Sequence, residues 1–178
     1  MLDPLAKFLI AGGWPATHVH IARFRDPLGS NVEHAVEIER AVARLRHSSN
    51  SESIAIVAHS MGGLATRWYL GHSADERIRS VIFLATPHRG TWLAWLGWGP
   101  GAAEMRPQSS FMRELQTVGL PADVRVLSFR APVDTRVWPS ASAWIEGAEQ
   151  KTLPAAGHRR ILRHPRVFDE IARALRDA

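Results

Sequence analysis

The stretch IAIVAHSMGGL, residues 54–64, decides the fold of this 178-residue chain. The apolar run Ser53–Ala58 overlaps its first half and is typical of a strand that is buried on both faces. Ser60 follows between two small residues, Ala58 and Gly62, and a helical pattern begins directly after it. A buried strand that turns sharply at a serine into a helix is the G-x-S-x-G nucleophile elbow, here with alanine in place of the first glycine.

A turn of this kind makes steric and chemical demands on its neighbours. It holds Ser60 in a strained conformation and brings two backbones close, so we expect Ala58 and Gly62 to be small for that reason. The helix after Ser60 directs its positive end at a developing oxyanion, and the N–H of Met61 supplies one donor to it. The alternative is an incidental serine in a strand-to-helix turn, because the five-residue pattern alone is loose enough to occur by chance.

Apolar runs and helical patterns alternate along the whole chain, which predicts an α/β fold with a mostly parallel sheet and helices on both faces. Asn31 is expected to cap a long amphipathic helix. Besides the strand at 53–58, the patterns predict strands at Val19–Ala22, Ser80–Ala85, Val124–Phe129 and, weakly, Gln150–Leu153, and helices near Leu5–Gly12, Leu64–Leu70, Ser110–Leu115 and Pro165–Leu175.

The composition, 46% hydrophobic and 22% charged, is that of a globular protein, and we expect residues 1–178 to form a single domain. The formal net charge is +5, but the arginines that cause it are scattered and accompany no recognisable nucleic-acid module. We therefore expect no nucleic-acid partner. Cysteine is absent, which excludes a disulfide framework, a thiolate metal site and a cysteine nucleophile.

The longest uncharged apolar stretch, Gly90–Ala103, is too short and too often interrupted by glycine and proline to cross a bilayer as a helix. The first residues contain Asp3, Pro4 and Lys7, which do not make a secretory leader. We thus expect neither a signal peptide nor a transmembrane segment in this chain. The cellular location and the oligomeric state stay open.

The segment VAHSMGGL, residues 57–64, together with LATPHRGT, residues 84–91, resembles bacterial lipases and esterases of the α/β-hydrolase superfamily. The resemblance reaches from about Leu5 to the C-terminus. It implies a serine hydrolase that cleaves carboxylic esters through an acyl-enzyme, with a small-molecule ester or a lipid as substrate. It implies no cofactor and no metal, and the sequence contains no H-E-x-x-H ligand pattern.

The same resemblance implies the chain order serine, acid, histidine for a catalytic triad. Asp134 lies in a loop after the predicted strand 124–129 and resembles the acid of the family. His158 follows the last predicted strand in a loop of the kind that holds the family's histidine, and it fits both the chain order and the loop. We therefore expect Ser60 as the nucleophile, Asp134 as the acid and His158 as the base, against the alternative that His158 is a lone solvent-facing histidine.

Residues 86–108 form the irregular part of the sequence, rich in glycine and proline. Within it Trp92, Trp95 and Trp98 follow one another at intervals of three, just after the C-terminal end of a predicted strand. Ligand crevices of α/β folds lie at such ends. The segment could be a lid or flap over the acyl site that binds substrate and makes transient contact with a membrane surface. Equally, the three aromatic rings could simply pack onto the domain.

The resemblance departs at the N-terminus. Relatives place a buried strand that ends in His-Gly before the first helix, and its loop gives the second oxyanion N–H. Here residues 1–4 open almost directly on the helix, so we expect one or more N-terminal strands to be absent. Either a gap of about twice the ~4.8 Å strand spacing then lies beside Val19–Ala22, or that segment moves across to pair directly.

Two explanations fit the departure: the sequence starts late, at an internal methionine, or it is a natural degenerate form. We favour the late start because each downstream catalytic element is intact. Loss of one oxyanion donor costs on the order of 10²–10³ in rate, so activity could be impaired. A non-catalytic binding module of the same fold, or an acyltransferase or thioesterase that uses the same triad, is the alternative function.

Overall fold

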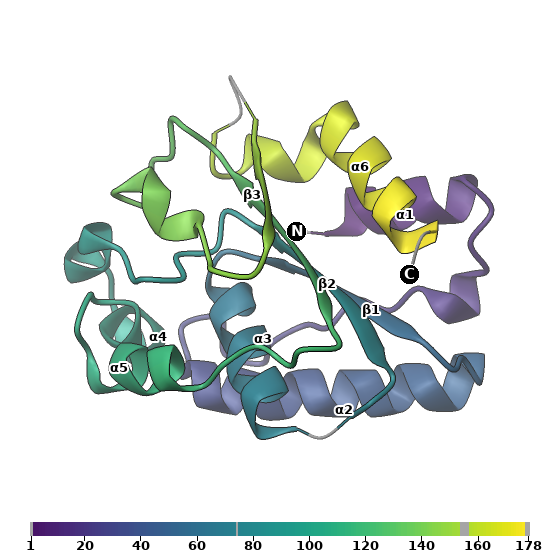
Figure 1. The fold of residues 1–178 in the computed structure, drawn as a ribbon, viewed down its shortest axis with the longest axis horizontal. Helices are drawn as coiled ribbons and strands as arrows, with labels where there is room; N and C mark the ends of the chain where they lie inside the picture. The colour runs from purple at the N-terminus through teal and green to yellow at the C-terminus, as the bar shows by residue number, and fades with distance from the viewer. Residues whose placement is uncertain (1, 74, 154–156, 177–178) are drawn as a thin grey trace.

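A computed structural model of the protein describes residues 2–73, 75–153 and 157–176. Its centre is a parallel sheet of four strands in the order β1-β2-β3-β4 (Figure 1). The four strands expected from residue 53 onward are confirmed to within about two residues at either end. They are β1 (Ile54–His59), β2 (Ile78–Leu84), β3 (Arg125–Arg130) and β4 (Glu149–Thr152).

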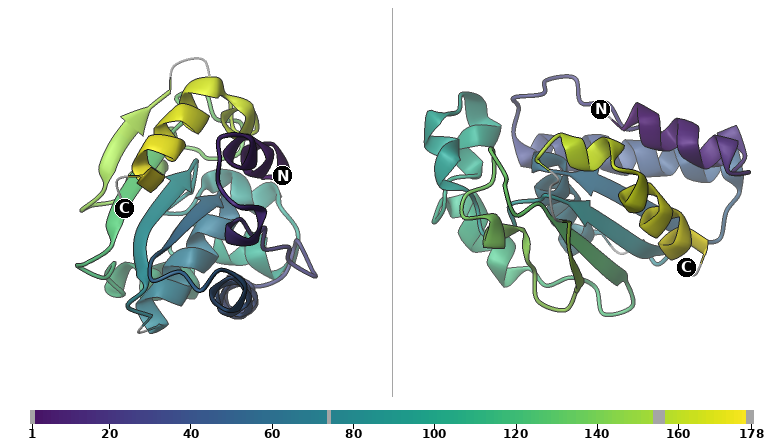
Figure 2. Two further views of the ribbon diagram at one scale, coloured as in Figure 1. Left: turned by 90° about the vertical axis from the view of Figure 1, so that its right-hand side faces the viewer. Right: turned by 90° about the horizontal axis from the view of Figure 1, so that it is seen from above.

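Helices cover both faces of the sheet, as the alternating pattern predicted. The helices α1 and α6 lie on one face, and α2 and α3 lie on the other (Figures 1 and 2). The shorter α4 and α5 lie beyond the C-terminal ends of the strands, where β2 leads into them. The helices are α1 (Asp3–Ala11), α2 (Asn31–Ser49), α3 (Met61–His72), α4 (Gly99–Glu104), α5 (Ser110–Thr117) and α6 (Pro165–Arg176).

The strand β2 explains why the apolar runs are continuous. It is paired on both edges and covered on both faces, so Val81, Ile82 and Phe83 are completely buried. One core lies between the sheet and α1 with α6, and a second lies between the sheet and α2 with α3. A strand between two such cores has no face that a polar side chain could share with water.

The N-terminus of α2 differs from the expectation by one residue. Ser30, not Asn31, is the N-cap, and its hydroxyl accepts a hydrogen bond from the N–H of Val32 at 3.1 Å. Asn31 is the first residue of the helix. Its backbone N–H and its side-chain amide both donate to the carboxylate of Glu104, at 2.6 and 2.8 Å. The carboxylate therefore fixes the end of α4 to the positive end of α2.

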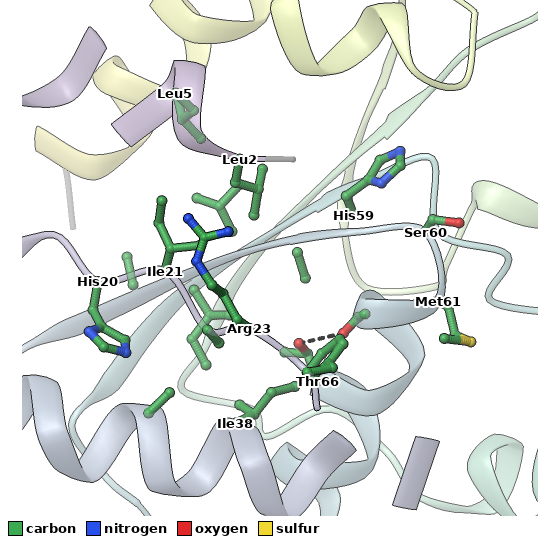
Figure 3. A pocket seen from close by; sticks show the side chains of 18 of the residues that line it. Leu2, Leu5, His20, Ile21, Arg23, Ile38, His59, Ser60, Met61 and Thr66 are labelled. Carbon is green, nitrogen blue, oxygen red and sulfur yellow. Dashed lines mark hydrogen bonds between the residues drawn. The ribbon is translucent and has the colours of Figure 1, made fainter. Parts of the chain in front are cut away.

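The expected strand at Val19–Ala22 does not form. The segment runs in an irregular conformation beside β1, and a cavity of about 860 Å³ is lined by both (Figure 3). The neighbouring residues are instead held by α2, because Phe24 stacks on His34 with ring centroids 4.0 Å apart and the Arg25 N–H donates to Glu37. The structure thus has the expected gap rather than direct pairing, and β1 is an edge strand of the described sheet.

No helix in the described part of the chain combines the length and the apolar character that crossing a membrane requires.

Candidate active site

Ser60 lies between β1 and α3, where the sequence predicts a nucleophile elbow. Its backbone has φ 54° and ψ −129°, a region that residues with a side chain adopt rarely and at a cost of about 1–3 kcal/mol. The Ser60 N–H donates to the carbonyl of Leu84 at 3.0 Å, so the turn is anchored to the end of β2. The side chain is consequently presented at the C-terminal edge of the sheet.

The tight contact expected at Gly62 occurs one residue later, and it is made with a side chain. A Cβ built on Gly62 would have Phe24 as its nearest neighbour, at an ordinary 3.7 Å. A Cβ on Gly63 would lie 2.0 Å from the hydroxyl of Thr86, which is fully buried. The expectation for Gly62 is therefore wrong: the contact between α3 and the residues after β2 requires glycine at position 63.

The three residues predicted as nucleophile, base and acid lie together, although 98 positions separate Ser60 from His158. The Nε2 atom of His158 is 2.9 Å from the Oγ of Ser60, and its Nδ1 is 2.9 Å from Oδ2 of Asp134. Because a carboxylate accepts and does not donate, the proton of the imidazole belongs on Nδ1. The lone pair of Nε2 then accepts the hydrogen bond of the Ser60 hydroxyl.

The environment of Asp134 keeps it ionised. Burial by itself would raise the pKa of this carboxyl. The hydrogen bonds from His158 and from the backbone N–H groups of Arg136 and Val137, at 2.7 and 2.8 Å for the latter two, outweigh burial and hold the pKa below its usual value. A negative charge fixed in this way orients the imidazole and stabilises it when it becomes positive.

Met61 stands where the sequence predicts an oxyanion donor. It is the first residue of α3, a helix of twelve residues whose first N–H groups have no acceptor inside the helix. Its N–H is therefore available beside the Oγ of Ser60. Among the described residues, no group of three or more His, Cys, Asp or Glu side chains could hold a metal ion.

The three tryptophans of the irregular segment do not line the cavity at Ser60. Trp92, Trp95 and Trp98 are 52%, 56% and 84% exposed, whereas Leu93 and Ala94 between them face the cavity. The short 3-10 helix η2 (Trp92–Leu96) thus turns Leu93 and Ala94 toward the cavity and the rings of Trp92 and Trp95 toward solvent. The domain covers about half of Trp92 and of Trp95, whereas Trp98 is mostly exposed.

The segment is attached at both ends. The N–H of Trp92 donates to the carbonyl of Trp138 at 3.0 Å, and the hydroxyl of Thr91 donates to the carbonyl of Arg136 at 3.0 Å. At the other end, Glu104 is bound to the start of α2 as described above. The exposed rings are therefore carried by a fixed stretch of chain beside the loop of Asp134.

One residue of the site was not singled out from the sequence. His59 is buried, and its Nε2 lies 2.9 Å from the backbone carbonyl oxygen of His158. The two imidazole rings are 4.7 Å apart and tilted by 50°. Burial, together with a smaller effect of the nearby His158, lowers the pKa of His59 to about 4. Its place directly before Ser60 in the elbow was the signal that could have drawn attention to it.

A model of the alpha/beta hydrolase fold family matches residues 16–111. The chain is also similar to three solved structures. The carboxyl esterase MGS0156 from a metagenome is 20% identical, with a TM-score of 0.73 over 88% of this chain and 58% of the esterase. The mature lipase BlEst2 of Bacillus licheniformis is 15% identical, with a TM-score of 0.69 over 84% of this chain and 76% of the lipase.

The third structure is the phospholipase PlaB of Legionella pneumophila, 18% identical, with a TM-score of 0.62 over 73% of this chain and 34% of the phospholipase. At these identities the likeness shows the fold alone. The chain spans less than two thirds of the length of the esterase and of the phospholipase.

Proposed function

The chain belongs to the alpha/beta hydrolase fold family, and from that premise we propose that it is a serine hydrolase that cleaves carboxylic esters. The observation that carries the proposal is the continuous chain of hydrogen bonds from Asp134 through His158 to Ser60, with both distances at 2.9 Å. The names of the similar solved structures, an esterase, a lipase and a phospholipase, support the ester bond as the target.

In the proposed reaction His158 takes the proton of the Ser60 hydroxyl as Oγ attacks the ester carbonyl. The negative charge that develops on the carbonyl oxygen is stabilised by the N–H of Met61 and the positive end of α3. His158 then gives the proton to the leaving alkoxide, and Asp134 stabilises the imidazolium between these steps. Water hydrolyses the acyl-enzyme by the same sequence of proton transfers.

The walls of the cavity favour an ester with an apolar part. Leucine, isoleucine and valine side chains of α1, α2 and β1 make up much of the lining, and none of the described residues that line it is aspartate or glutamate. Four arginines, among them Arg136 and Arg159, do line it. Neutral or anionic esters with an acyl chain therefore suit this cavity better than cationic ones.

The proposal is tested with p-nitrophenyl butyrate under pre-steady-state conditions. We expect a burst of p-nitrophenol stoichiometric with folded protein, and mass spectrometry should find the butyryl group on Ser60. The Ser60→Ala variant should show neither. A folded wild-type protein without a burst and without the acyl adduct would overturn the proposal and favour a binding module of the same fold.

A further inference from the structure

His59 occupies a position that links the nucleophile to the base. It is the last residue of β1 and precedes Ser60 in the chain. Its side chain reaches the backbone of His158, 99 positions away, with 2.9 Å between Nε2 and the carbonyl oxygen. A carbonyl oxygen can only accept, so the proton of the His59 imidazole is on Nε2 and the ring is the donor.

This bond acts on the residue that must be placed most accurately. The Nε2 atom of His158 lies within hydrogen-bond distance of Ser60 only while the His158 backbone keeps its place. His59 ties that backbone directly to the end of the strand that holds Ser60. A displacement of the base by about 1 Å can cost on the order of 10²-fold in rate.

Packing alone would not favour a histidine at this site. The Nδ1 atom of His59 is buried without a hydrogen-bond partner among the described residues. An apolar ring of the same size would fill the space without leaving a buried nitrogen unpaired. The imidazole is thus accounted for by the bond that its other nitrogen makes.

The charge state of His59 suits this role. Burial keeps its pKa at about 4, so it is neutral at neutral pH and can donate from Nε2. The titratable groups that face it are His158, at 4.7 Å between ring centroids, and Asp134. When His158 takes the proton of Ser60, a neutral neighbour adds no repulsion to the new positive charge.

We propose that His59 is a positioning residue, which fixes the backbone of His158 so that its imidazole stays in line with Ser60. The inference rests on the proposed function of the triad, and it extends that function to a residue outside the triad. His59 also lines the cavity at Ser60, but it takes no part in the proposed proton transfer.

The experiment compares two substitutions of His59. His59→Phe keeps a ring beside His158 but removes the donor, and His59→Gln places an amide N–H near the position of Nε2. The matched control is His34→Phe, because His34 is also buried, its Nε2 lies 2.8 Å from the Asp26 carbonyl oxygen and its Nδ1 is also unpaired, but it lies on α2.

With p-nitrophenyl butyrate and active sites counted by a fluorophosphonate, we expect His59→Phe to lower kcat by roughly 10–100-fold with KM within about threefold of wild type. We expect His59→Gln to keep kcat within about threefold. His34→Phe should lower stability without changing kcat per active site. A kcat for His59→Phe within threefold of wild type, or an equal loss in His59→Gln, would overturn the inference.

A second measurement does not depend on activity. The Nδ1–H proton of His158, held by Asp134, should give a downfield resonance in the proton NMR spectrum of the wild type. It should shift or broaden in His59→Phe and persist in His59→Gln and His34→Phe. An unchanged resonance in His59→Phe contradicts the inference, whereas failure of the proposed function appears earlier, as a wild type that the fluorophosphonate does not label.

Discussion

The two sides of β1 have very different neighbours. On one side the strand is paired with β2 along its whole length, and the chain beyond leads to Asp134 and His158. On the other side the edge of β1 has no strand beside it in the described part of the chain, and a cavity of about 860 Å³ separates it from residues 19–24. The paired side therefore leads to the groups proposed for proton transfer, and the open side borders the cavity proposed for the substrate.

The burial of the side chains of β1 and β2 shows the same difference. Both segments are apolar runs, but Val81, Ile82 and Phe83 of β2 are completely buried, whereas Ala55, Ile56 and Val57 of β1 are only half-buried. A strand's burial thus depends on what lies on either edge as much as on its own sequence. The predictions below test each side in turn.

The largest effect is expected on the paired side. His158→Ala should lower kcat/KM for p-nitrophenyl butyrate by roughly 10⁴-fold or more, and Ser60→Ala by a similar factor, because the members of a triad act as one unit. The double variant should be no less active than either single one. His47→Ala, which removes an exposed imidazole on α2, serves as the control. Retention of more than about a tenth of the activity in His158→Ala would show that another group is the base.

Two glycine substitutions at the start of α3 compare the paired side with the open side. Gly63 faces Thr86 at the end of β2, whereas Gly62 faces Phe24 on the open side. Gly63→Ala should lower the free energy of unfolding by about 3 kcal/mol, because its Cβ would lie 2.0 Å from the Thr86 hydroxyl. Gly62→Ala should be neutral or slightly stabilising, since alanine favours helix and meets nothing closer than 3.7 Å.

Urea unfolding of the two variants beside the wild type measures the difference. Equal losses of stability in both would contradict the assignment of the close contact to Gly63.

Acid should lower the free energy of unfolding of the protein through protonation of His59. Burial holds the pKa of its imidazole at about 4 in the folded protein, whereas the unfolded chain binds the proton near pH 6.5. The contribution of His59 to the free energy of unfolding is therefore fully present above pH 6.5 and is lost as the pH falls toward 4. Between pH 7 and pH 5 the wild type should lose about 2 kcal/mol more than His59→Gln, which has no proton to bind.

The buried His88, whose pKa is also lowered, keeps a part of the acid sensitivity in the variant. The lowered pKa of Asp134 adds a loss only below about pH 4, outside this interval. Unfolding free energies at the two pH values are compared, and an equal loss in both proteins would mean that His59 is accessible to protons in the folded state.

The features that the sequence predicted correctly depend on local pattern and on chain order. Apolar runs marked four strands because a strand between two cores has no polar face. The proximity of Asp134 and His158 to Ser60 could be expected, because each follows a strand in the order that the resemblance to the superfamily implies and the fold brings these strand ends together. Their catalytic roles are a proposal.

The features that it did not predict depend on which distant segment comes close. The apolar residues 19–22 would make a strand only if a partner lay within hydrogen-bond distance, and α2 holds their neighbours elsewhere. The need for glycine at Gly63 arises from Thr86, and the role proposed for His59 arises from a carbonyl 99 positions away. None of these neighbours can be read from the residues on either side.

The smallest effect on the fold is expected from the tryptophans beside the Asp134 loop. Trp92, Trp95 and Trp98 are at least half exposed, so their replacement by serine should change the melting temperature little. One loss is the contact of the Arg106 guanidinium with Trp95, 4.4 Å from the ring centroid, which at an exposed site is worth about 0.5–1 kcal/mol.

The effect should instead depend on how the substrate is presented. If the rings make contact with a lipid surface, the triple variant should lose roughly tenfold in activity on long-chain esters in vesicles and keep its activity on dissolved p-nitrophenyl butyrate. Leu93→Ser, which alters the cavity wall between the tryptophans, should lower activity on both substrates. Equal losses on both substrates in the triple variant would mean that the rings shape the cavity, and a fall in melting temperature of more than a few degrees would mean that they stabilise the fold.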